Sequence, residues 1–289
     1  MKQYEEAMPT YLSMPSKIGE EISITGKWVP REKGGLFRKS DDSKEMLKEW
    51  EDIHNNAKND IGILSTEINH AVEEDAVLIH HVFKNALALV NYFSTTATEH
   101  MEALTKVAKP ELHLIRGVQL TEPAREAVLA KGVPGMFGEF LFGYVKEDYM
   151  RPDPETAIQV TAKWTCIPGE ENHLEELKYW WQKVGTDAFS MEKGLLRFEV
   201  YQVVGENALI IHETFIDSDE LQFHLSKGTA EKYKKDIDKI AVPENYFFRG
   251  PVSWMIRTYS KFLHLPATYS SQGSNFTRAG GSMIDGKLV

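Results

Sequence analysis

The amino-acid sequence predicts an α+β fold in which one β-α-β-β-α-β unit occurs twice along the chain. Two observations support this prediction. Four sequence blocks of the first half return in the second half, in the same order and at nearly constant spacing. Within each half, segments with alternating apolar residues are separated by segments with the apolar period of a helix.

The repeat can be followed block by block. The blocks of the first half are ISITGKW at 22–28, GILSTEI at 62–68, DAVLIHHVF at 75–83 and KPELHLIRG at 109–117. Their counterparts are IQVTAKW at 158–164, GLLRFEV at 194–200, NALIIHETF at 207–215 and VPENYFFRG at 242–250. The period is far longer than that of a solenoid repeat, so each copy is a unit of domain size.

The first two elements of each copy follow from apolar spacing. Ile22, Ile24 and Trp28 share one parity, which predicts a half-buried strand. A helix should follow in each copy, because the apolar residues within 46–57 and 174–184 fall on one helical face. The remaining elements are a hairpin at 62–83 and 194–215, a helical region at 89–107 and 221–240, and a strand at 112–120 and 246–256.

This order is the ferredoxin-like arrangement, in which two helices cover one face of a four-stranded antiparallel sheet. The other face still carries apolar side chains and needs a cover. The second copy can supply that cover. The sequence therefore predicts two tandem ferredoxin-like repeats packed as an intramolecular dimeric α/β barrel, a pseudo-dimer within one chain.

The predicted domain boundaries follow the repeat. The first repeat spans 18–120 and the second 155–262. The connector at 121–154 should hold a short helix and an extra strand, and a strand is expected to continue through 254–263. The Gly- and Ser-rich segment within 263–289 is predicted to be a C-terminal tail or a lid over a cleft.

Composition limits the classes of function. The formal net charge is −10 without a long basic run, which disfavours nucleic acid and anionic membrane partners. Cys166 is the single cysteine, so no disulfide framework is expected within the chain. No apolar run has the length of a membrane span and the start lacks a signal-peptide pattern, which predicts a cytoplasmic protein.

Several common catalytic motifs are absent from the sequence. It has no Walker loop and no G-x-S-x-G nucleophile elbow, and GVPGMFG at 132–138 has the wrong spacing for a dinucleotide fingerprint. Nucleotide and acyl-enzyme chemistry are therefore disfavoured. We expect no bound cofactor and no metal site, and a small molecule as the substrate.

One segment carries a family resemblance. The run ETFIDSDELQFHLSKGTAEKY at 213–233 resembles the segment after the third strand of antibiotic biosynthesis monooxygenase domains. Its matching residues are Phe215, Asp217, Leu221 and His224. The first copy has Phe83, Asn85, Leu89 and Tyr92 at the same places. The resemblance extends over both repeats, and its motifs are mostly structural.

The resemblance implies the dimeric α/β-barrel fold, which two chains usually build together. It also implies cofactor-free oxidation of electron-rich aromatic substrates, as in some members. Related barrels cleave haem or isomerise small metabolites, and others have no known activity. This sequence shows no match to the residue set of the haem-degrading relatives.

Histidines are the main candidates for chemistry. His80 and His212 occupy the same repeat position, which fits either two equivalent sites or a shared packing role. His224 has no histidine counterpart in the first copy, as expected if a single site is active, although helix capping is an alternative. An imidazole can take a proton from a phenol or enol at neutral pH.

The other candidates would contact a substrate. Trp28 and Trp164 are a matched pair that could wall a flat ligand or pack in the core. Trp180 exceeds the needs of one buried stripe and could line a pocket or an interface. Arg249, like Arg116 before a glycine, could bind a phenolate or form a structural ion pair.

The leading hypothesis is a cofactor-independent, monooxygenase-like oxidoreductase for a flat aromatic or polyketide-like molecule. His212 or His224 would deprotonate the substrate for reaction with O2, beside Trp164 and Trp180. His80, Trp28 and Arg249 would also bind it. Two alternatives remain open: a non-catalytic small-molecule-binding or stress-response protein, and a cofactor-free isomerase or lyase. Further homodimerisation of the chain is also left open.

Overall fold

The structure is a computed structural model that describes residues 8–12, 19–31, 39–146, 153, 155–169, 173–277, 283–284 and 287–288. The chain divides into two compact units, each built around one repeat. The first-repeat unit comprises Gly19–Glu139 and Ser270–Val289, and the second-repeat unit comprises Met1–Ile18 and Phe140–Tyr269. Each unit is an α+β domain.

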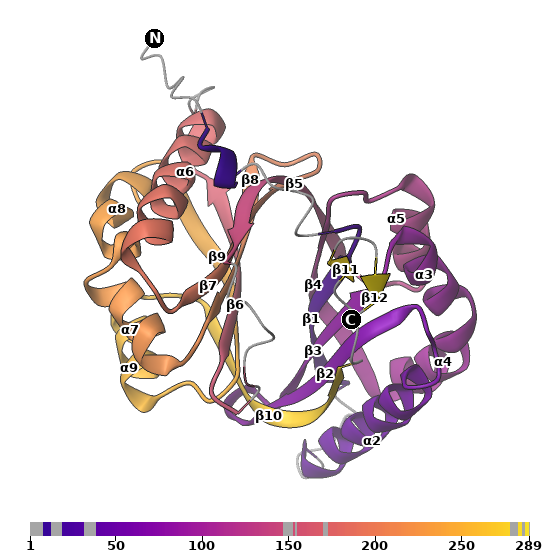
Figure 1. The fold of residues 1–289 in the computed structure, drawn as a ribbon. Helices are drawn as coiled ribbons and strands as arrows, with labels where there is room; N and C mark the ends of the chain where they lie inside the picture. Colours follow the sequence, from indigo (N-terminus) through magenta and orange to yellow (C-terminus); the bar gives the residue numbers. More distant parts are fainter. Residues whose placement is uncertain are drawn as a thin grey trace. The chain divides into compact units, whose positions relative to one another are not determined.

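The first-repeat unit follows the predicted order. Its elements are β1 (Ile22–Pro30), α2 (Lys39–Ala57), β2 (Ile63–Ala71), η2 (Val72–Glu74), β3 (Ala76–Phe83), α3 (Ala86–Asn91), η3 (Tyr92–Thr96), α4 (Thr98–Val107), β4 (Ala108–Gly117), α5 (Glu122–Leu129) and the start of β5 (Gly135–Val145). The antiparallel sheet has the order β2-β3-β1-β4. Its helices gather on one face of the sheet (Figure 1).

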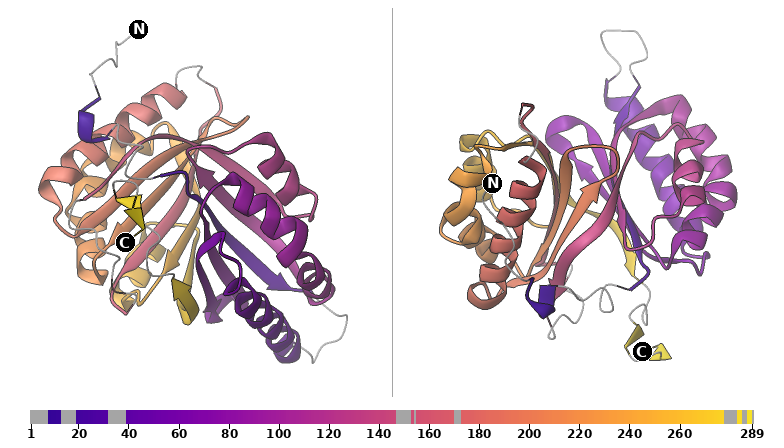
Figure 2. Two further views of the ribbon diagram at one scale, coloured as in Figure 1. Left: turned by 45° about the vertical axis from the view of Figure 1, so that its right-hand side comes forward. Right: turned by 90° about the horizontal axis from the view of Figure 1, so that it is seen from above.

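The second-repeat unit has the same plan. Its elements are β6 (Ile158–Cys166), α6 (His173–Met191), β7 (Leu195–Val203), β8 (Ala208–Phe215), α7 (Ser218–Ser226), α8 (Thr229–Ile237), β9 (Ala241–Arg249), α9 (Trp254–Phe262) and the start of β10 (Ala267–Thr277). Its sheet order, β7-β8-β6-β9, repeats that of the first unit. Figure 2 shows the helices of each unit on one face of that unit's own sheet. The short elements η1 (Thr10–Leu12), β11 (Met283–Ile284) and β12 (Lys287–Leu288) complete the described chain.

Two long strands, β5 and β10, each belong in part to both units. Gly135–Glu139 of β5 pair in parallel with β4, and the rest of this strand neighbours β7 in the second-repeat unit. Strand β10 begins beside β9 and continues beside β2. Along the paired strands the order is β1-β3-β2-β10-β9-β6-β8-β7-β5-β4, so that each unit carries the four-stranded sheet of one predicted ferredoxin-like repeat together with parts of β5 and β10.

One predicted strand is wrong. The segment 254–263 was expected to extend the last strand, but Trp254–Phe262 forms helix α9. The chain leaves β9 at Arg249, Gly250 adopts a positive φ of 112°, and the Ser253 side chain caps the helix by accepting a hydrogen bond from the Ile256 backbone N–H. Helix α9 corresponds to α5 of the first unit, and β10 corresponds to β5. The repeated unit is therefore longer than the four matching blocks indicate.

The core of each unit lies between its sheet and its helices. In the first-repeat unit, Ile24 and Ile79 of the sheet pack against Trp50 and Ile53 of α2. The third-strand register is identical in the two units, because Thr25 pairs with His80 as Thr161 pairs with His212. The helix after β3 or β8 is capped at the same position by Asn85 or Asp217.

Candidate active site

A buried cavity of about 10 Å³ lies between the sheet and the helices of the first-repeat unit. This volume is close to what one water molecule needs. Its walls are aromatic and apolar, with two imidazoles among them. The lining residues are Ile24, Trp28, Trp50, Ile79, His81, Tyr92, Phe93, Met101, His113 and Val133. Each of them is at most 9% exposed.

Several polar atoms in this wall lack a hydrogen-bond partner among the described residues. They are Nε2 of His81, both ring nitrogens of His113, and the indole nitrogens of Trp28 and Trp50. A buried donor or acceptor left unpaired costs about 1–3 kcal/mol. Such groups are rare in folded proteins and require a specific explanation. All four residues line the same cavity, where a bound polar molecule could supply the missing partners.

The two imidazoles of this cavity are neutral at physiological pH. Burial lowers the pKa of His81 to about 3, and the nearby His54 acts in the same direction. Burial also lowers the pKa of His113 to about 3, with a smaller contribution from His81. Nδ1 of His81 lies 3.2 Å from Oγ1 of Thr66. The Nε2 atom of His81 has no hydrogen-bond partner among the described residues.

Local sequence explains why both rings reach the cavity. His81 pairs across the strands with Ile24, on the parity of β3 that faces the helices. His113 pairs with Gly26 of β1, where a Cβ atom would overlap the His113 ring. Glycine therefore leaves the space in which the ring lies. The Trp28 ring meets the His113 ring edge-on, with centroids 5.6 Å apart.

One helical part of the cavity wall is irregular. Tyr92–Thr96 form the π-helical turn η3 between α3 and α4. Tyr92 and Phe93, which begin this turn, both line the cavity. Single π-turns within helices are frequent at functional sites. The regular α-helical hydrogen-bond pattern is therefore interrupted at this part of the cavity wall, where Ala97 N–H donates to the carbonyl oxygen of Tyr92 at 2.8 Å.

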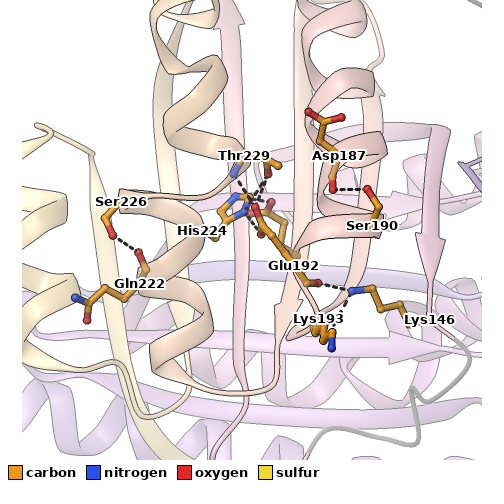
Figure 3. Close-up of polar contacts among 10 residues, drawn as sticks. Lys146, Asp187, Ser190, Glu192, Lys193, Gln222, His224, Ser226 and Thr229 are labelled. Carbon is orange, nitrogen blue, oxygen red and sulfur yellow. Dashed lines mark hydrogen bonds and ion pairs between the residues drawn. The ribbon is translucent and has the colours of Figure 1, made fainter.

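The equivalent place in the second-repeat unit has different chemistry. Glu213 replaces His81, His224 replaces Tyr92, and Tyr246 replaces His113. Nδ1 of His224 lies 2.7 Å from Oε2 of Glu192, and its Nε2 lies 3.2 Å from Oε1 of Glu213. Both ring nitrogens are therefore engaged in ion pairs. Figure 3 shows His224 beside Glu192 and Thr229, and Glu192 directly follows the last residue of α6.

This ion cluster is held by further hydrogen bonds. The backbone N–H and the hydroxyl of Thr229 donate to Oε1 of Glu192 at 2.6 and 2.7 Å. These bonds and His224 lower the pKa of Glu192, although burial alone would raise it. Burial alone would lower the pKa of His224, but Glu213 and Glu192 outweigh it and raise this pKa to about 10. His224 is thus a buried imidazolium, and cannot act as a base while it remains protonated.

No protein-family model matches this chain, and no curated protein sequence matches it. Similar solved structures include a candidate monooxygenase from Lactobacillus acidophilus NCFM, with 13% identity, a TM-score of 0.48, and coverage of 78% of this chain and 91% of that chain. An anthrone oxidase-like protein has 8% identity, a TM-score of 0.46, and coverage of 79% and 89%.

A half-sized structure is also similar. It is a candidate antibiotic biosynthesis monooxygenase from Bacteroides thetaiotaomicron, with 16% identity and a TM-score of 0.30. The match covers 35% of this chain and 93% of the other. These likenesses concern the fold alone.

The two strand histidines that were proposed from the sequence lie on the other face of their sheets. Nδ1 of His80 is 3.0 Å from Oγ1 of Thr25, and Nδ1 of His212 is 3.0 Å from Oγ1 of Thr161. The parity of β8 places His212 opposite Glu213, so His212 does not share the sheet–helix space with His224.

The arginine and tryptophan candidates are also separated. Arg249 is buried and donates to Oε1 of Gln159 at 2.6 Å. Trp164 packs edge-on against Trp181, with centroids 5.7 Å apart, in the core of the second-repeat unit. Trp180 instead contacts Tyr179 and Tyr233 among the helices. Of the predicted residues, Trp28 is the one that lines the cavity.

Sequence reasoning missed His81, His113 and Trp50 as site residues. The alternation of β3 does place His81 on the helix-facing parity, so this signal was available. The position of His113 depends on the cross-strand space beside Gly26, which a single sequence does not reveal.

The described residues show neither a metal-binding cluster nor a membrane-spanning helix. They contain no group of three or more metal-binding side chains suited to hold an ion. None of the helices described is both long and apolar enough to cross a membrane.

Proposed function

We propose that this chain is a cofactor-independent, monooxygenase-like oxidoreductase whose reaction site is the sheet–helix cavity of the first repeat. The substrate class is a flat, electron-rich aromatic molecule with an acidic C–H or O–H group. One observation carries the proposal: neutral imidazoles and unpaired indole N–H groups converge on one enclosed aromatic cavity.

Each group has a chemical role in this proposal. In this proposal, the neutral His81 carries its hydrogen on Nδ1 and donates it to Oγ1 of Thr66, 3.2 Å away, which leaves Nε2 as the nitrogen that accepts a proton from the substrate. The substrate anion and the new imidazolium then stabilise each other in a site of low dielectric. The indole N–H groups of Trp28 and Trp50 donate to the oxygen on which negative charge develops.

The overall reaction is balanced without a cofactor. An activated CH2 group loses one proton to His81, and the resulting carbanion reduces O2 as the new C–O bond forms. The peroxide takes up that proton. Loss of the second C–H proton then breaks the O–O bond, which leaves a carbonyl group and one molecule of water. The four electrons that O2 accepts all come from the substrate carbon.

The cavity must enlarge to accept such a substrate, because about 10 Å³ holds no aromatic ring. We assign this movement to α3, η3 and α4, which supply Tyr92, Phe93 and Met101 to the wall. The break in regular α-helix geometry at η3 is the place in this segment where we expect the movement to occur. Binding of a flat ligand between the rings would then quench the fluorescence of Trp28 and Trp50.

The test is O2 consumption with chelator-treated protein and a panel of anthrones, which carry the activated CH2 group that the reaction requires. We expect turnover that His81→Gln abolishes and that the matched second-repeat variant Glu213→Gln retains. His113→Gln, with folding checked by circular dichroism, should lower kcat. No O2 uptake with any member of the panel would overturn the proposal.

The same panel separates this site from the one proposed from the sequence. If His212→Ala or His224→Ala abolished turnover and His81→Gln did not, the reaction site would lie in the second repeat. Turnover that continued without O2 would identify an isomerase or lyase. Quenching by the panel without any turnover would identify a binding protein.

A further inference from the structure

Helices α7 and α9 form an open groove of about 370 Å³ on the surface of the second-repeat unit. The two helices lie side by side in Figure 1. Helix α9 contributes Trp254, Met255, Thr258, Tyr259 and Phe262, and α7 contributes Gln222 and Ser226. Trp254 is 73% exposed and Phe262 is 74% exposed.

The first repeat shows that the fold does not require these aromatics. Helix α5 corresponds to α9, and its buried Ala124 and Val128 match the buried Ile256 and Ser260 of α9 at one offset. At that offset, the outward positions of α9 have their own counterparts. Trp254, Thr258 and Phe262 correspond to Glu122, Glu126 and Ala130. The same helix is thus charged or small on the outside in one repeat and aromatic in the other.

The lining has the composition of an interface core. Interface cores are enriched in Trp, Tyr, Phe and Met and depleted of charged residues. All seven lining residues are uncharged. The chain as a whole has a formal net charge of −10. Two copies of this negatively charged chain can therefore meet at this surface without burying charges of the same sign.

The shape fits the same partner. An isologous dimer requires a self-complementary patch, in which a projection of each copy enters a hollow of the other. Here the projecting side chains of Trp254 and Phe262 stand at the hollow that α7 and α9 enclose. We propose that two copies of this chain associate through the α7–α9 groove, with Trp254 of each copy seated in the groove of its partner.

The test is sedimentation velocity of the full chain over a wide concentration range. We expect a concentration-dependent dimer. Trp254→Glu, which installs the first-repeat residue, should weaken the dimer Kd by about 30-fold or more, as expected for a central aromatic anchor. Phe262→Ala is a milder second variant. The matched control is Leu129→Glu on α5, where Leu129 is 52% exposed, and it should leave the dimer intact.

Two outcomes would overturn the inference. One is a wild-type chain that stays monomeric at every concentration. The other is a dimer that Trp254→Glu and Phe262→Ala leave unchanged while circular dichroism shows both variants folded. A monomer that sediments with neutral phosphatidylcholine vesicles through Trp254 would instead assign the groove to a lipid surface, and would also overturn it. The α7–α9 groove does not contain the residues of the proposed reaction, so O2 uptake does not depend on this result.

Discussion

Acid should destabilise the protein through the two buried imidazoles of the first-repeat cavity. The pKa values of His81 and His113 are both lowered to about 3 by burial, from an ordinary value of 6.5. The unfolded chain therefore binds more protons than the folded chain at any pH between these values. The stability that comes from neutral imidazoles is complete above about pH 6.5 and is lost as the pH falls towards 3.

The size of this effect follows from the shift. At about pH 5, each unfolded histidine lies roughly 1.5 pH units below its pKa while the folded ring stays neutral, which costs about 2 kcal/mol per histidine. The pair therefore costs about 4 kcal/mol relative to pH 7.5, within a total stability of about 5–15 kcal/mol for a typical domain. This difference is large enough to measure.

The assay is urea unfolding of wild type and of the double variant His81→Gln/His113→Gln at about pH 7.5 and pH 5. Glutamine does not titrate, so the double variant should lose about 4 kcal/mol less than wild type on acidification. His100→Gln is the matched single-histidine control. If wild type and the double variant lost stability equally, within about 1 kcal/mol, the rings would not be neutral and buried, and the general-base argument would fail with them.

Three further perturbations have defined outcomes. Burial alone would lower the pKa of His224, but Glu213 and Glu192 raise it to about 10. The stability that the charged His224 gives to the folded chain is therefore complete below about pH 6.5 and is lost as the pH rises through 10. Between about pH 7 and pH 9 this loss should be about 2 kcal/mol in urea unfolding, and His224→Gln should remove the slope. Gly26→Ala should displace the His113 ring, lower stability by about 1–3 kcal/mol and abolish O2 uptake, whereas Ala162→Gly should keep activity. Asp217→Ala removes an N-cap and should cost about 1 kcal/mol in thermal unfolding; no change would mean that the cap contributes nothing.

The duplicated architecture could be predicted because repetition is independent of local propensity. Each of the four matching blocks occurs in both halves of the chain, so the blocks define eight strands independently of the secondary-structure propensity of each segment. The structure confirms the order of these strands. The failure at Trp254–Phe262 has a local cause. The aromatic and β-branched residues there favour a strand, but Ser253 caps a helix whose buried residues are only Ile256 and Ser260. The matching helix α5 carried a clearer signal through its alanines and glutamates.

The candidate site was harder to predict, because it depends on which buried polar groups have partners. His224 stood out in the sequence as a histidine without a repeat counterpart, yet Glu192 and Glu213 approach it from other strands and loops and hold it as a cation. His81 was overlooked beside His80, although the two face opposite sides of β3. Side-chain pairing between distant segments is a tertiary property that spacing along one chain does not encode.

The two repeats place different side chains at the same buried positions, and this difference supports the functional proposal. A buried imidazole is stable either as a cation between carboxylates or as a neutral ring with partners for its nitrogens. In the second repeat, His224 is a cation between the carboxylates of Glu192 and Glu213. In the first repeat, the imidazoles are neither paired with carboxylates nor fully hydrogen-bonded, because Nε2 of His81 and both ring nitrogens of His113 have no partner among the described residues. Each unpaired group costs about 1–3 kcal/mol, and a fold tolerates this cost when the surrounding structure is stable enough. A ligand that supplies the missing hydrogen-bond partners would recover this free energy on binding.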